Sequence, residues 1–220
     1  MEVAECNDLF IRGGRDFVLQ DDEILAWEGL VSSDNTTPRP VWPTVMVAGH
    51  RPKHLTPVAQ TWVRAELNRL AGKLRDGHGT TTAISGMTLG ADLWWADAAV
   101  RAGLRVHAHL PYPQQAAKWK PEDQAEWWRL LGLATKTLTY GTGHDEGLLH
   151  ARKRGMVHAS AQTVAVWVYG KSGGTRTALE YAVGRGRRPI WVDPETRRTI
   201  WPDIEVWRRL LAPQPRRRAA

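Results

Sequence analysis

Short runs of strand-forming residues alternate with stretches of helical periodicity along most of the chain. Apolar or β-branched runs predict strands at residues 45–48, 105–110, 136–140, 164–168 and 189–192. Apolar residues spaced three and four apart predict helices that begin at Pro57, near Ala91 and after Gly174, and helices over residues 122–134, 148–160 and 203–211. This alternation predicts an α/β fold, a three-layer arrangement in which helices flank a parallel sheet.

Glycine marks three of the turns from a predicted strand into a helix. These turns read Gly49-His50-Arg51-Pro52, then Ser85-Gly86 with Gly90-Ala91-Asp92, and finally Tyr169 with Gly173-Gly174-Thr175. Backbone amides at such a turn lie at the positive end of the helix dipole, and a missing side chain lets an anion approach them. Glycines also make ordinary tight turns, so one turn alone is a weak signal. Three of them at the carboxyl edge of one sheet predict a crevice that holds a phosphate-bearing ligand.

The order of these segments resembles a known group of proteins. The three turns, together with Leu110-Pro111, Gln115 and Trp119, are similar to the pattern of YpsA-like proteins of the SLOG superfamily. That superfamily joins the LOG nucleotide-processing enzymes to the Rossmann domain of DNA-processing protein A. The resemblance covers residues 44–194 and implies a Rossmann-like domain that binds a nucleotide, a nucleotide-sugar or an ADP-ribose-like ligand.

The remaining chain lies outside this resemblance. Residues 1–43 predict an N-terminal extension, whose last part, 32–43, carries three prolines and is typical of a linker. Residues 44–212 form the expected nucleotide-binding domain, and residues 213–220 form a basic tail. The length of 220 residues suits one large domain.

Composition narrows the function classes. The single cysteine, Cys6, cannot form an internal disulfide, and no residues have zinc-site spacing, so we expect a cytoplasmic protein without a metal or cofactor. No apolar run is long enough to cross a bilayer, and the acidic start is unlike a signal peptide, so we expect no membrane partner. The net charge of +7 suggests nucleic acid, but much of it lies in the tail and near residues 185–188, while the first 35 residues are acidic. Exposed apolar helix faces would also allow a homodimer.

Each turn offers side chains with a binding role and an ordinary alternative. Arg51 suits a bidentate phosphate contact or a surface salt bridge, and His50 suits a ligand contact or a turn cap. Asp92 suits a ribose hydroxyl, although a carboxylate in the first turn of a helix is favoured by the dipole alone. Ser85 suits a turn amide. The remaining candidates are backbone at Gly49, Gly86, Gly90, Ala91, Gly173 and Gly174, a phosphate contact from Thr175, a contact from Gln115, and a base platform from Trp119 or Tyr169. Eight of the twelve tryptophans lie in predicted helices or strands and are expected in the core, namely Trp62, Trp94, Trp95, Trp127, Trp128, Trp167, Trp191 and Trp207.

The resemblance leaves the chemistry open. LOG enzymes cleave an N-glycosidic bond with an arginine and a glutamate, and the matching candidates here are Arg154 and Glu180. This chain departs from the LOG pattern, because Arg176 and Thr177 stand where the acid is expected and one glycine is missing. A nucleotide N-glycosidase, a non-catalytic nucleotide sensor and a single-stranded DNA-binding protein therefore remain as alternatives. The last is disfavoured because the arginine-asparagine-arginine run of DNA-processing protein A is absent.

Overall fold

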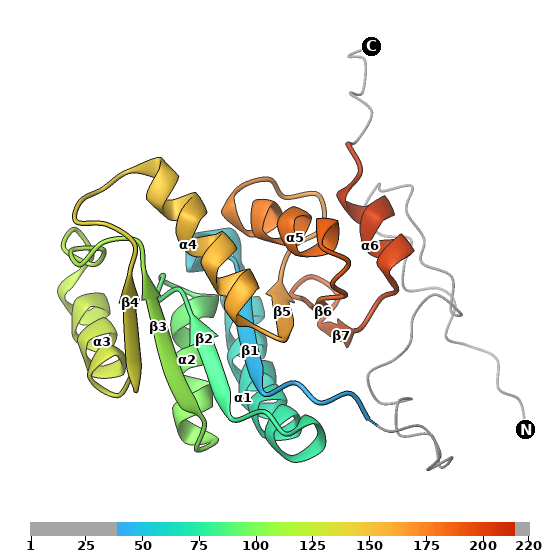
Figure 1. Cartoon of the computed structure of the whole chain (residues 1–220), viewed down its shortest axis with the longest axis horizontal. Coiled ribbons are helices and arrows are strands. Elements are labelled where there is room, and N and C mark those ends of the chain that lie inside the picture. The colour runs from blue at the N-terminus through green and yellow to red at the C-terminus, as the bar shows by residue number, and fades with distance from the viewer. Residues whose placement is uncertain (1–38, 214–220) are drawn as a thin grey trace, which may run out of the picture.

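The computed structural model describes residues 39–213 and shows one seven-stranded sheet covered by helices on both faces (Figure 1). The strands are β1 (Thr44–Gly49), β2 (Thr82–Ser85), β3 (Arg105–Leu110), β4 (Lys136–Thr139), β5 (Gln162–Val166), β6 (Ile190–Asp193) and β7 (Arg198–Ile200). The helices are the 3-10 turn η2 (Pro52–His54) and α1 (Pro57–His78), α2 (Ala91–Arg101), α3 (Pro121–Gly132), α4 (Glu146–Ala159), α5 (Gly174–Gly184) and α6 (Ile204–Leu211).

The sheet has the order β4-β3-β2-β1-β5-β6-β7. Strands β1 to β6 pair in parallel, and only β7 runs antiparallel, against β6. The chain winds outward from β1 to β4 and then returns to place β5 on the other side of β1. The strand order therefore reverses between β1 and β5, and in open α/β sheets the crevice outside the carboxyl ends at such a point is the usual ligand site.

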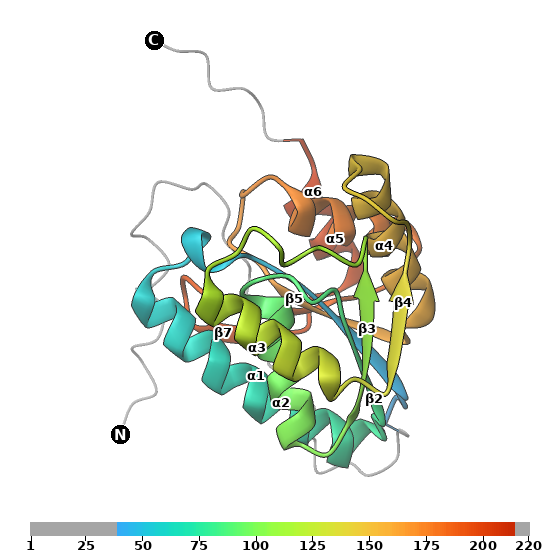
Figure 2. The ribbon, with the colours of Figure 1, turned by 90° about the vertical axis from the view of Figure 1, so that its left-hand side faces the viewer.

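Helices α1, α2 and α3 cover one face of the sheet, and α4, α5 and α6 cover the other (Figures 1 and 2). Successive residues of β1 point to opposite layers, as the period of a strand requires. Val45 and Val47 pack in the core cluster that contains α1 and α2, whereas Met46 and Ala48 pack against Met156 of α4 and its neighbours. The central strand is thus buried on both sides, which explains its continuous apolar run.

The predicted elements within residues 39–213 are confirmed, and the structure adds strand β7 and the 3-10 turn η2. Strand β7 is too short for a periodic signal, and a turn with Arg197 at a positive φ of 55° folds it back onto β6. Trp42, in the stretch that the sequence assigns to a linker, is buried and stacks on His78 of α1, with ring centroids 4.2 Å apart. The ordered core therefore begins before β1.

The tryptophans mostly fill the core as expected. Trp167, Trp191 and Trp207 pack together, with ring centroids 5.8–6.2 Å apart, between the β5–β6 part of the sheet and α6. The expectation was wrong for Trp128 of α3, which is 61% exposed. No helix within residues 39–213 has both the length and the apolar character to cross a membrane.

Candidate functional site

A cavity of about 830 Å³ opens at the carboxyl ends of the central strands. Its walls come from the end of β1, the first turn of α2, the loop after β3, the loop before α4, the inner face of α4 and the start of α5. Nine of the predicted binding residues line it, namely Gly49, His50, Arg51, Asp92, Gln115, Trp119, Gly173, Gly174 and Thr175. The structure thus brings together side chains from all three glycine turns.

The turn before α2 is closed by its own hydrogen bonds. The Met87 amide donates to Ser85 Oγ at 3.0 Å, and the Thr88 amide donates to Asp92 Oδ2 at 3.4 Å. The Ala91 amide, at the helix start, donates to the carbonyl of His50 at 3.2 Å. Because these amides are occupied within the protein, the expectation that they lie bare for a phosphate was wrong.

The glycines of this turn serve packing instead. A Cβ on Gly86 would lie 1.7 Å from Arg152 Nη1, so only glycine admits the arginine there. Gly90 has a φ of +94°, and a Cβ on it would lie 2.5 Å from the His50 carbonyl oxygen. Gly49 has the same function, because its Cβ would lie 2.2 Å from the Cβ of Ala91. Ser85, Gly86, Gly90 and Ala91 form the support behind the cavity and are not among the residues that line it.

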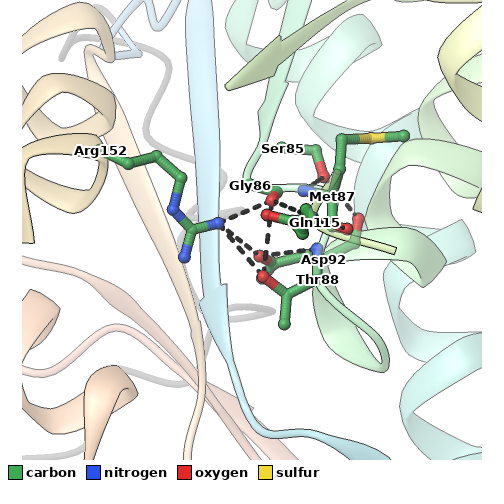
Figure 3. A network of polar contacts seen from close by, with 7 residues as sticks. All are labelled: Ser85, Gly86, Met87, Thr88, Asp92, Gln115 and Arg152. Carbon is green, nitrogen blue, oxygen red and sulfur yellow. Dashed lines mark hydrogen bonds and ion pairs between the residues drawn. The ribbon is translucent and has the colours of Figure 1, made fainter. Parts of the chain in front are cut away.

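Arg152 is the functional candidate that the sequence analysis missed. It points from α4 toward the turn before α2, where Nη1 donates to the Gly86 carbonyl at 2.7 Å and to Thr88 Oγ1 at 3.2 Å (Figure 3). The same nitrogen lies 3.4 Å from Asp92 Oδ2. Arg152 is only 7% exposed and Asp92 only 6%, and both line the cavity. They form a buried ion pair at its floor.

Burial and charge act in opposite directions on this pair. Burial raises the pKa of the Asp92 carboxyl, and the charge of Arg152 opposes that rise. Burial likewise lowers the pKa of the Arg152 guanidinium, against the attraction of Asp92. The Nε atom of Arg152 is buried and has no hydrogen-bond partner among residues 39–213. An arginine with unused donors at a cavity floor is suited to receive an anionic group.

Gln115 fixes the loop that follows β3. Its amide nitrogen donates to the carbonyls of Gly86 and Met87, which ties this loop to the turn before α2. Gln124 of α3 holds the same loop through the Trp119 carbonyl at 2.8 Å. Trp119 is thereby held at the cavity wall, and the rings of Tyr112 and His144, which contact each other edge-on, line the cavity as well.

The start of α5 forms the opposite wall. Gly173, with a φ of +108°, is the N-cap residue, and no side chain caps the helix. The Lys153 ammonium of α4 lies close by, 3.1 Å from the position that a Cβ on Gly174 would take. Burial, and then the charge of Arg152, lower the pKa of Lys153. No acidic side chain of the described chain pairs with this ammonium.

His50 is buried where β1 ends. Burial, followed by the charges of His54 and Lys171, lowers its pKa to about 4, so its ring is neutral near pH 7. The ring also makes a hydrogen bond to the backbone of Val168, while Nε2 is buried without a partner within the described range. Nδ1 therefore carries the proton, and Nε2 can only accept a hydrogen bond.

The predicted catalytic pair is not at the cavity. Arg154 is exposed, with its guanidinium 5.6 Å from the ring centroid of Tyr181, and Glu180 is exposed and paired with Arg176 at 2.7 Å. Helix phase explains both corrections. Residues 152, 153 and 156 of α4 face the cavity, so residue 154 points away, and Glu180 lies two residues beyond Ala178, which lines it.

Tyr169, the second predicted base platform, also lies outside the cavity. Its ring packs edge-on against Trp167, 5.9 Å between centroids, beside the core cluster under α6, and it does not line the cavity. Of the two proposed base platforms, only Trp119 is in place. Over residues 39–213, no group of three or more His, Cys, Asp or Glu side chains is arranged to hold a metal ion.

Comparison with known proteins identifies the fold. No protein-family model and no curated protein matches the sequence. DNA processing protein A (DprA) from Streptococcus pneumoniae aligns over 68% of this chain and 50% of its own, with a TM-score of 0.52 and 18% identity. DprA from Helicobacter pylori, described for its single-stranded DNA binding mode, aligns over 80% and 75%, with a TM-score of 0.53 and 16% identity.

A molybdenum cofactor binding protein from Rippkaea orientalis aligns over 68% of this chain and 75% of its own, with a TM-score of 0.45 and 17% identity. The present chain spans half the length of the S. pneumoniae protein. The two DprA structures share the fold of this chain, which confirms the Rossmann-like fold that the sequence resemblance implies.

Proposed function

We propose that the cavity binds a phosphate-bearing ligand of the nucleotide class, with a phosphate at the start of α5. The observation that carries this proposal is the place of the Lys153 ammonium beside Gly174, at the positive end of that helix, without an acidic partner in the described chain. The Lys153 ammonium and the positive end of the α5 dipole repel each other, because both lie in a half-buried position. An anion placed between them removes this cost.

The chemistry of the surroundings suits a phosphate. The first amides of α5 have no carbonyl partner inside the helix, and no side chain caps them. The buried hydroxyl-bearing residue Thr175 lines the cavity next to them, and Arg152 faces it from the floor. Amides at a helix start, an ammonium and a guanidinium are the groups that commonly hold phosphate in proteins.

The other half of the cavity suits a nucleoside. Trp119, Tyr112 and His144 offer ring faces or edges against which a base can pack. Nε2 of the neutral His50 ring and the Asp92 carboxylate can both accept a hydrogen bond. The lysine and arginine side chains of the cavity can only donate. Hydroxyl or amino groups of a nucleoside supply the donors that such acceptors require.

Binding without turnover is the activity we favour. Arg154 and Glu180, on which N-glycosidic cleavage depended, lie outside the cavity, and the acid that does line it, Asp92, is held by Arg152. A nucleotide sensor therefore fits these residues better than a hydrolase. Single-stranded DNA remains the rival ligand, because the H. pylori structure that shares this fold is described as binding it.

Calorimetric titration with AMP tests the proposal. We expect wild-type protein to bind AMP and Lys153→Met to lose at least tenfold in affinity, because the ammonium contact to the phosphate is gone. Arg154→Met is the matched control, one residue along the same helix and outside the cavity, and its affinity should equal that of wild type.

Three results would contradict the proposal. They are the absence of AMP binding, equal losses in Lys153→Met and Arg154→Met, and tight binding of a thymidine 12-mer that persists when salt is raised. Release of free adenine during the incubation, followed by chromatography, would restore the hydrolase alternative.

A further inference from the structure

We propose that the ligand carries at least two phosphate groups, the second bound by Arg51 and Lys53 of the turn after β1. This inference rests on the function proposed above, because it concerns the same cavity. It narrows the ligand class from nucleotides in general to nucleoside diphosphates and compounds with a diphosphate linkage.

Cations outnumber acidic side chains in the lining of the cavity. The lining contains five lysine and arginine side chains, and Asp92 is its one acid. Arg152 and Asp92 offset each other as an ion pair. Four cations remain, Arg51, Lys53, Lys118 and Lys153, and none of them has an ion-pair partner among residues 39–213.

One phosphate monoester neutralises only part of this charge. It carries a charge of about −1.5 to −2 at pH 7, which leaves roughly two of the four cations unbalanced. Several arginines outside the cavity, such as Arg69 and Arg129, are instead paired with acidic side chains at the surface. The accumulation of unpaired cations at one cavity therefore indicates a ligand with more than one phosphate.

These cations come from different parts of the fold. Lys153 extends from α4 to the start of α5, on one side of the sheet, whereas Arg51 and Lys53 belong to the turn that leads into α1, on the other side. A phosphate seated on α5 leaves the Arg51–Lys53 pair without a counter-charge. A second, covalently linked phosphate extends the negative charge across the end of β1.

His54 directly follows Lys53 and also lines the cavity. Burial, then Lys171, Lys53 and Arg51 in that order, lower the pKa of His54. The Lys171 ammonium lies near it, donating to the His54 carbonyl at 3.2 Å. The His54 ring is 5.6 Å from that of His50, which lines the same cavity. This side of the cavity is thus positive in its own right, apart from the site at α5.

The test compares AMP with ADP as calorimetric probes. We expect wild-type protein to bind ADP at least tenfold more tightly than AMP, and the double variant Arg51→Ala/Lys53→Ala to lower this ratio to within about twofold of unity. The double variant Lys136→Ala/Arg185→Ala removes the same charge outside the cavity and should keep the wild-type ratio. All four positions are exposed, and circular dichroism melts check that each variant is folded.

The possible results test the diphosphate inference and the proposed function separately. Equal affinities of wild type for AMP and ADP, or an ADP preference that survives Arg51→Ala/Lys53→Ala, would overturn the inference while the proposed function stands. Failure of wild type to bind either nucleotide would overturn the proposed function as well. ADP-ribose as a third probe separates a terminal from a linking diphosphate, and tight binding of either one supports the inference.

Discussion

Arg152 Nη1 lies 3.4 Å from Asp92 Oδ2, and both residues are buried. The pair joins α4 to the first turn of α2 (Figure 3), so the cavity has a floor made of two helices that belong to opposite faces of the sheet. An ion pair in such a place contributes to stability mainly through the cost of breaking it, because either partner left alone is a buried, uncompensated charge.

We expect Arg152→Met to lower the free energy of unfolding by about 3–5 kcal/mol, since it leaves Asp92 without its counter-charge. The double variant Arg152→Met/Asp92→Leu should recover most of this loss, because it removes both charges. Urea denaturation measures both values, and Arg154→Met serves as the exposed control on the same helix. A double variant no more stable than the single one would contradict this account.

Gly174→Val should reduce AMP affinity at least tenfold. A side chain there fills the space between the helix amides and the Lys153 ammonium, where the phosphate is proposed to lie. Gly184→Val, at the other end of α5, faces open space and should leave the affinity unchanged. Titrations of both variants, each with a native circular dichroism spectrum, check the prediction, and equal affinities would remove the start of α5 from the site.

Trp119→Ala should weaken AMP binding by about tenfold or more, because stacking of a base on an aromatic ring contributes roughly 1–3 kcal/mol. Inorganic pyrophosphate, which has no base, should bind the variant as it binds wild type. Trp128→Ala is the control, since Trp128 is 61% exposed and does not line the cavity. A matching loss for pyrophosphate would show that Trp119 acts only by shaping the loop.

Stability should fall as the pH drops from about 6.5 toward 4. Burial lowers the pKa of His50 and His109 to about 4, whereas in the unfolded chain a histidine titrates near 6.5. The unfolded state therefore takes up protons in this window that the folded state does not, which favours unfolding as the pH falls. Each histidine should cost about 1–2 kcal/mol between pH 7.5 and 5.

Urea denaturation at these two pH values measures the loss. His109→Gln should show a smaller difference than wild type, because one of the two buried rings is gone. His150→Gln, at an exposed position of α4, should keep the wild-type difference. An unchanged difference in His109→Gln would exclude that histidine as a source of the acid sensitivity.

The sequence predicts the layers of this fold well, because they follow from local patterns. The buried run of β1 and the cap of α1, where Thr56 Oγ1 accepts from the Ala59 amide at 3.2 Å, are both readable in a single stretch of chain. Strand β7 is not, since three residues carry no period and its pairing with β6 depends on a turn.

The site is only partly predictable, because a glycine turn looks the same whether its amides are free or occupied. At α2 the partners of those amides include the carbonyl of His50, which follows β1 and is distant from α2 in the sequence. The prediction of Arg154 as a site residue took no account of helix phase, which places Arg152 and not Arg154 at the cavity. The apolar residue Met156 is buried, and the residue four positions before it, Arg152, lies on the same face of the helix. This spacing would have indicated Arg152.

Gly49 ends the central strand in a space too small for any other residue. A Cβ at this position would lie 2.2 Å from that of Ala91 and 2.9 Å from that of Val166, so a helix and a neighbouring strand both close on it. Trimming Ala91 to glycine would still leave Val166 in the way. Two compensating changes would have to precede any substitution at position 49, and each alone would loosen the core. No single substitution at position 49 is therefore tolerated. We expect relatives in which α2 packs against β1 to have glycine at this position.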